Sequence, residues 1–182
     1  MNAPLLDVQG LSVVFGGLTA VHDFSMKVEA GRIHALIGPN GAGKTTTFNC
    51  ISRYYQPTTG RIVFGGMDVT HHRPHQMAAL GVARTFQNLE LFAELSVLDN
   101  VLLGAYSTAA RAPQARLRPY DAETIDFAGH LIERVGLGDF HRTAAKNLDF
   151  GRQKLLELAR ALAIRPRLLL LDEPAAGLRN RE

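Results

Sequence analysis

Hydrophobic and polar positions follow two different patterns along the chain, a strand-like one near the start and a helical one later. Through the first third, short apolar runs rich in valine, isoleucine and phenylalanine are separated by glycines, which is typical of strands joined by tight turns. The strands predicted in this way are Leu6–Val8, Ser12–Phe15, Phe24–Val28, Ile33–Ile37 and Arg61–Phe64. We therefore expect a strand-rich first part.

From about residue 88 to 145 the spacing becomes helical. Ser96 and Asp99 form an N-cap signature that opens one helix, and apolar residues lie on one face of the stretch from Asp121 to Val135. Arg152–Ile164 predicts another helix, and Leu168–Leu171 predicts a short buried strand after it. The pattern indicates a strand-rich core, a helical insertion, and a return to the core.

The segment Gly38–Thr45 carries the most specific chemistry in the chain. It matches the motif G-x-x-x-x-G-K-[ST], whose glycines let successive backbone N–H groups converge on phosphate. Lys44 adds a positive charge for the terminal phosphates, the Thr45 hydroxyl suits Mg²⁺, and a helix predicted from Lys44 to Arg53 begins there. The alternative is a chance glycine-rich turn, which for this length occurs on the order of 1% of the time. We expect a nucleoside triphosphate to bind here.

A second candidate follows the predicted strand Leu168–Leu171, where Asp172 and Glu173 stand side by side. Ligands of α/β proteins lie at the carboxyl ends of buried strands. Asp172 suits Mg²⁺ and Glu173 suits a base that deprotonates the attacking water. By itself an apolar run that ends in two acids is more often a solvated strand end, but the phosphate loop upstream favours the functional reading.

Composition narrows the class further. The chain has 182 residues, 46% hydrophobic and 20% charged, as in ordinary globular proteins, and its net charge of +3 does not by itself indicate a nucleic-acid partner. Its only cysteine, Cys50, fits a reducing compartment and is expected to pack as a small apolar residue. No apolar run is long enough to span a bilayer, so we expect any membrane role to come through a partner. The histidines at 71, 72 and 75 are expected to lie in a solvated loop rather than to bind metal.

Four ordered motifs together resemble the nucleotide-binding subunits of ABC transporters. They are Gly38–Thr45, Thr85–Gln87, Leu148–Gln153 and Leu171–Pro174. The fragments Gly81–Asn88, Ser96–Val101 and Glu173–Leu178 are most similar to the ATP-binding subunits of branched-chain amino-acid uptake systems. The resemblance covers essentially the whole chain.

The resemblance implies a role for each matched position. Phe15 would stack on adenine, although a buried core phenylalanine is the alternative. Gln87 would reach Mg²⁺ or the attacking water, and Glu173 and Gln87 would be the catalytic residues. Mg²⁺ would be held by Thr45, Gln87 and Asp172. The nucleotide would be bound by Phe15, Gly38, Pro39, Asn40, Gly41, Ala42, Gly43, Lys44, Thr45, Thr46, Asp149 and Gly151.

Three features depart from the family pattern. Asp149 stands where a serine commonly contacts phosphate, and capping of the following helix is its alternative role. Arg179 stands where the family often has Asp or Asn. The resemblance further implies a histidine beyond the last residue, Glu182, so we expect a truncated chain that binds ATP and hydrolyses it slowly or not at all.

The expected fold class is α/β, a P-loop NTPase core of the ABC type with an antiparallel β subdomain and an inserted helical subdomain, the C-terminal part of the core missing. We expect one ABC domain over residues 1–182, with a core at 1–87, a helical subdomain at 88–150, and the signature helix and Asp-Glu strand at 151–182.

The resemblance implies an ATP-hydrolysing subunit that energises import of branched-chain amino acids or a similar small solute. The alternatives are a non-hydrolysing nucleotide-binding fragment and a soluble ABC-type ATPase. The implied partners are a second copy or a related ATP-binding subunit, and membrane permease subunits that hold the chain peripherally at the cytoplasmic face of the membrane.

Overall fold

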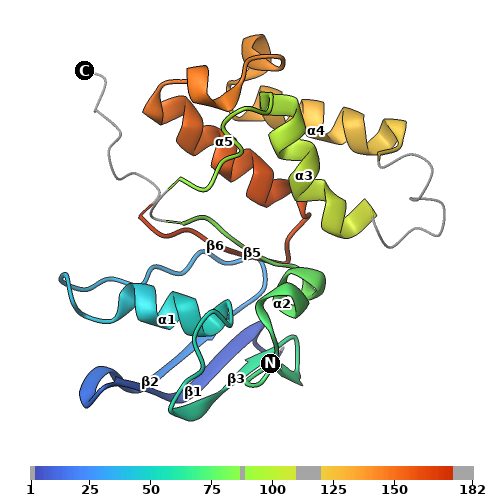
Figure 1. Cartoon of the computed structure of the whole chain (residues 1–182). Helices are drawn as coiled ribbons and strands as arrows, with labels where there is room; N and C mark the ends of the chain where they lie inside the picture. The colour runs from blue at the N-terminus through green and yellow to red at the C-terminus, as the bar shows by residue number, and fades with distance from the viewer. Residues whose placement is uncertain (1–2, 87–88, 110–119, 174–182) are drawn as a thin grey trace. The chain divides into compact units, whose positions relative to one another are not determined.

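The computed structural model describes residues 3–86, 89–109 and 120–173, and the chain divides into two compact units, Met1–Met77 and Ala78–Glu182. Figure 1 shows the strands of the first unit in blue and green and the helices of the second from green to red. Each unit is described by itself.

The first unit is built on a four-stranded antiparallel sheet. Its strands are β1 (Leu6–Phe15), β2 (Leu18–Val28), β3 (Thr59–Phe64) and β4 (Met67–Asp68), in the order β2-β1-β3-β4. Alternate side chains of β1 and β3 are buried on one face of this sheet, because successive residues of a strand point to opposite faces. The unit also contains the helix α1 (Lys44–Ile51) and the first half of α2 (Pro74–Leu80), which continues into the second unit after Met77 (Figure 1).

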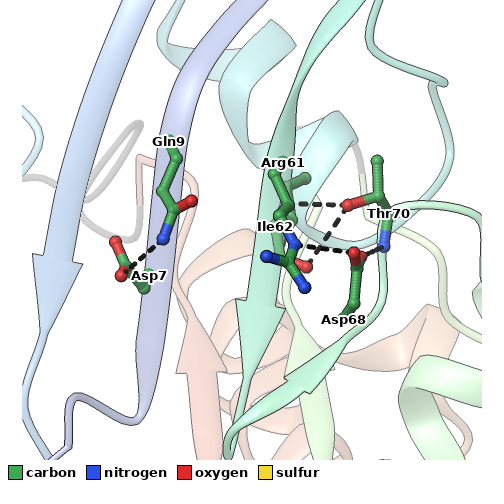
Figure 2. Close-up of polar contacts among 6 residues, drawn as sticks. All are labelled: Asp7, Gln9, Arg61, Ile62, Asp68 and Thr70. Atoms are coloured by element: carbon green, nitrogen blue, oxygen red, sulfur yellow. Dashed lines mark hydrogen bonds and ion pairs between the residues drawn. The ribbon is translucent and has the colours of Figure 1, made fainter.

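Polar contacts organise the other face and the end of this sheet (Figure 2). Thr70 extends the ladder beyond β4, since its Oγ1 accepts from the Ile62 amide at 2.9 Å and its own amide donates to Asp68 Oδ1 at 2.9 Å. Arg61 Nε donates to Asp68 Oδ2 at 2.7 Å. The hydrogen bonds from Thr70, and then Arg61, hold the pKa of Asp68 well below its usual range. On β1, Gln9 donates to Asp7 at 2.8 Å.

The second unit consists mainly of three helices, α3 (Val97–Ala109), α4 (Ala122–Arg134) and α5 (Phe150–Ala163). Short 3-10 turns at Gly138–Phe140 and Ala145–Asn147 connect α4 to α5. The helices enclose a common apolar core, formed by Val97, Val101, Leu102, Ala105, Ala128, Leu131, Ile132, Leu137, Ala145, Leu148, Leu156, Ala159 and Ala163. None of the helices among the described residues is long and apolar enough to cross a membrane.

Two short strands of the second unit pair in parallel, β5 (Val82–Arg84) and β6 (Leu168–Leu170). Their register places Val82 opposite Leu168 and Arg84 opposite Leu170. The residues that follow each strand therefore leave the same edge of the pair, because parallel strands end together.

Most elements predicted from the sequence are confirmed, including α4, α5, β3 and β6. The two strands predicted at Leu6–Val8 and Ser12–Phe15 form one continuous strand, since Gly10 at a φ of 56° lies in a register shift of the ladder rather than in a break.

The strand predicted at Ile33–Ile37 is wrong. Residues 32–40 form no regular element, and Ile33 and Ile37 are 101% and 89% exposed. A strand forms only where a neighbour completes its ladder, and among the described residues no strand pairs with this segment. The apolar sequence therefore indicates a preference for β structure, but it does not show whether another strand is there to pair with it.

Candidate nucleotide-binding site

The loop from Gly38 to Gly43 curls tightly before α1 begins. The Ala42 amide donates to the Pro39 carbonyl at 3.2 Å, and Gly41 and Gly43 have φ values of 84° and 81°. A Cβ on Gly43 would lie 2.5 Å from the carbonyl oxygen of Ala20 on β2. Glycine is required at position 43 both by its backbone conformation and by this close approach.

The N-terminus of α1 is open to an anion. Its N-cap, Gly43, offers no side-chain acceptor, and its first turn contains no acidic residue. The first N–H groups of a helix lack intrahelical partners and carry a partial positive charge. Thr45 and Thr46 lie in this first turn, where Thr45 is exposed.

Lys44 adds a full charge at the same place. Its Nζ donates to the carbonyl oxygens of Gly38 at 2.8 Å and Pro39 at 2.9 Å, so the ammonium group lies over the loop. Within the described part of the chain, no carboxylate forms an ion pair with Lys44. The loop, the open helix N-terminus and the lysine together form a site suited to phosphate.

Phe15 ends β1 and is 46% exposed. This exposure contradicts the alternative of a buried core phenylalanine. The end of β1 lies close to the phosphate loop. Gly43 approaches Ala20 and Val21 of β2, and β2 pairs with β1 up to Phe15, which lies opposite Leu18. The exposed ring is thus available to an apolar or aromatic part of a ligand.

Asp172 follows β6 in the second unit and is buried. Its Oδ2 accepts from Arg84 Nη2 at 2.9 Å, with both side chains less than a tenth exposed, and its amide donates to Thr85 Oγ1 at 3.3 Å. Glu173 comes next, exposed and at a φ of 47°, a conformation that is uncommon for residues other than glycine. The strand end therefore holds one carboxylate inside and presents the other to solvent.

The N-terminus of α5 is closed by Asp149. Its Oδ1 accepts from the Arg152 amide at 2.8 Å, and its Oδ2 forms an ion pair with the Arg152 guanidinium. Asp149 therefore has the capping role that was its alternative in the sequence. Gly151 lies half-buried in the first turn of the same helix.

Two buried charges on α5 were missed by sequence reasoning. Glu157 Oε1 accepts from the Phe86 amide at 2.8 Å, and Lys154 Nζ donates to the Phe86 carbonyl at 3.2 Å. Lys154 and Glu157 lie 3.6 Å apart and are almost completely buried. The signal available was a pair of opposite charges spaced i, i+3 on the predicted helix Arg152–Ile164, which follows the predicted nucleotide-binding motif Leu148–Gln153. Gln87, which directly follows Phe86, lies outside the described residues.

Cys50 and the histidines at 71, 72 and 75 lie outside the phosphate loop, and His75 lies in the first turn of α2 rather than in the predicted loop. Cys50 is completely buried, and burial raises the pKa of its thiol, as expected for a packed residue. The described residues contain no group of three His, Cys, Asp or Glu side chains that could hold a metal ion.

The structure thus places the predicted residues in two sets. Phe15 and the loop Gly38–Thr46 belong to the first unit, and Asp149, Gly151, Asp172 and Glu173 belong to the second. Arg179 and the fragment after Glu173 lie outside the described residues.

Comparison with known proteins agrees with this arrangement of motifs. The ABC transporter family matches residues 21–176. The chain is 42% identical over 188 residues to the high-affinity branched-chain amino acid transport ATP-binding protein BraF of Pseudomonas aeruginosa, which covers 100% of this chain and 74% of that protein. It is 41% identical over 190 residues to the corresponding protein LivG of Escherichia coli K12, with the same coverage of 100% and 74%.

Solved structures show the same fold. The ADP conformation of MJ1267, an ATP-binding cassette of an ABC transporter, is 31% identical with a TM-score of 0.84 and covers 98% of this chain and 72% of that chain. A nucleotide-free ATP-binding cassette from an ABC transporter is 30% identical with a TM-score of 0.81, over 96% and 70% of the two chains.

The chain belongs to the ABC transporter family. The predicted fold class, an ABC-type P-loop core with an antiparallel β subdomain, is confirmed. So is the predicted class of function, an ATP-binding, ATP-hydrolysing subunit that energises a transporter.

Proposed function

We propose that this chain powers the import of branched-chain amino acids or a similar small solute, with ATP and Mg²⁺ bound at the loop Gly38–Thr46. The observation that carries the proposal is the open N-terminus of α1, which has no side-chain cap, together with the Lys44 ammonium over the loop. The names of the relatives BraF and LivG supply the solute class.

The residues suit Mg²⁺ chemically. Thr45 offers a hydroxyl, Asp172 a carboxylate and Gln87 an amide oxygen, and Mg²⁺ prefers such oxygen ligands. Asp172 accepts from Arg84 through Oδ2, and an ionised carboxylate can accept at both of its oxygens. The ion would neutralise charge on the transferred phosphate. Glu173 acts as the base that accepts a proton from water, and Gln87 orients that water.

The partners in this proposal are a second ATP-binding subunit and membrane permeases. The first turn of α5, with Gly151, faces a nucleotide bound by the paired subunit, and Asp149 keeps its capping bond there. Permease subunits hold the chain at the cytoplasmic face of the membrane.

The test of ATP use is a binding titration beside a phosphate-release assay on the whole chain. Charge-assisted hydrogen bonds contribute about 1.5–3 kcal/mol, so Lys44→Met weakens ATP binding by about 10- to 150-fold. Glu173→Gln keeps ATP binding and abolishes phosphate release. Lys27→Met, at an exposed lysine on β2, is the matched control and changes neither. Unchanged ATP affinity in Lys44→Met refutes the proposed site.

The solute class has a separate test. Cells that lack their own branched-chain ATP-binding subunits are supplied with this chain, and uptake of labelled leucine is measured. Restored uptake supports the proposal, whereas uptake that stays at background while the chain co-purifies with the permease argues for another solute.

A further inference from the structure

Phe15 is in contact with a second aromatic ring, that of Tyr55. The ring centroids lie 5.3 Å apart at an interplanar angle of 75°, an edge-to-face arrangement. Tyr55 is 41% exposed and Phe15 is 46% exposed, so the pair lies at the surface of the first unit rather than in its core. Neither the resemblance nor the motifs assign a role to Tyr55.

The segment that carries Tyr55 is fastened at both ends. At its start, the backbone amide of Tyr55 itself donates to the Asn49 carbonyl of α1 at 3.1 Å. After it, the Thr58 amide donates to the Ser12 carbonyl at 2.8 Å, and Thr58 Oγ1 accepts from the Val14 amide at 2.9 Å. Tyr55 is therefore tied both to the helix that begins at the phosphate loop and to the strand that ends in Phe15.

We propose that Tyr55 is a positioning residue that sets the Phe15 ring for the purine base of ATP. The inference rests on the proposed function, since it assigns a base to Phe15. An exposed phenylalanine at a strand end rotates among its rotamers, and an aromatic neighbour restricts that freedom before the ligand arrives. The contact occupies part of the Phe15 ring and leaves the exposed remainder to the base.

The expected signature is an effect on the base and not on the phosphates. An edge-to-face pair is worth little on its own, so removal of the Tyr55 ring weakens ATP binding by about threefold to tenfold. Inorganic tripolyphosphate has no base and contacts only the loop Gly38–Thr46, so its affinity stays unchanged. A merely structural role would weaken both ligands together.

The experiment titrates ATP and tripolyphosphate into the whole chain by calorimetry, for wild type, Tyr55→Leu, Tyr55→Phe and Met67→Leu. Tyr55→Leu loses ATP affinity alone, and Tyr55→Phe restores it because the ring remains. Met67, half exposed on β4 of the same unit, is the matched surface control and has no effect. In a Phe15→Leu background, Tyr55→Leu has no further effect on ATP.

The outcomes separate the two claims. ATP affinity that Tyr55→Leu leaves intact overturns the inference while the proposed function stands. Equal weakening of ATP and tripolyphosphate also overturns it, because the tyrosine then only supports the fold. A wild-type chain that binds tripolyphosphate but not ATP overturns the proposed function, and the inference falls with it.

Discussion

Two helices of this chain begin at motifs to which the family resemblance assigns phosphate recognition, and they begin in opposite ways. α1 starts at Gly43, with no side-chain cap and no acidic residue in its first turn. α5 starts at Asp149, whose carboxylate caps the helix and pairs with Arg152. The partial positive charge at the N-terminus of α1 is open to a ligand, whereas that of α5 already interacts with the Asp149 carboxylate.

The same contrast extends to the charged side chains near each motif. Lys44 is held by two backbone carbonyls. Arg84 and Asp172, and likewise Lys154 and Glu157, are buried ion pairs in the second unit. The difference teaches that Lys44 forms no ion pair among the described residues, whereas the four buried charges of the second unit are paired with one another inside the fold.

The largest expected effect comes from breaking one of the buried pairs. Arg84→Met leaves Asp172 buried without its cation and lowers the free energy of unfolding by about 3–5 kcal/mol. Lys44→Met changes it by less than about 0.5 kcal/mol, since no buried charge loses its partner. Urea denaturation of both variants measures the difference.

The control is the double variant Arg84→Met with Asp172→Asn, which removes both charges and recovers most of the loss. If Arg84→Met is as stable as wild type, the ion pair is not structural and the contrast between the units fails.

An intermediate effect comes from two glycines of the phosphate loop. Both have positive φ, but only Gly43 meets other atoms, with a Cβ position 2.5 Å from the Ala20 oxygen; at Gly41 nothing lies within 4 Å. Gly43→Ala costs about 2–4 kcal/mol of stability from strain and overpacking. Gly41→Ala costs about 1 kcal/mol from strain alone. Thermal denaturation compares them, and equal losses contradict the close approach at Gly43.

The smallest effect tests the closed helix. Asp149→Ala removes the cap of α5 and costs about 1 kcal/mol, whereas Asp149→Ser keeps a capping oxygen and costs a few tenths. Denaturation of the two variants measures this.

Asp149→Ser also removes the carboxylate from a proposed phosphate contact, so ATP-dependent association of the chain strengthens. Weaker association in the serine variant would show that the carboxylate assists the nucleotide.

The local parts of the site were predictable from the sequence. The phosphate loop, the α5 helix and the acids after β6 are each encoded within a few neighbouring residues, so spacing and propensity were enough. Capping by Asp149, the alternative to its predicted nucleotide contact, was recognisable for the same reason, because its partner is only three residues away.

The parts that were not predicted depend on contacts distant in sequence. Arg84 and Asp172 are 88 residues apart, and Glu157 and Phe86 are 71 apart. Tyr55 meets Phe15 from a segment that Thr58 ties to β1. The wrong prediction at Ile33–Ile37 has the same origin, since a short apolar run encodes a preference for strand and a neighbouring strand decides whether a strand forms.

That exposed segment also has a practical consequence. Ile33 and Ile37 flank an uncharged, β-prone stretch that pairs with no strand in the described part of the chain, and such a sequence can template pairing between molecules. Preparations of this chain will therefore self-associate as they are concentrated. Dilute handling, or a charged substitution at position 33 or 37, should keep the material soluble for longer than any change made at the phosphate loop.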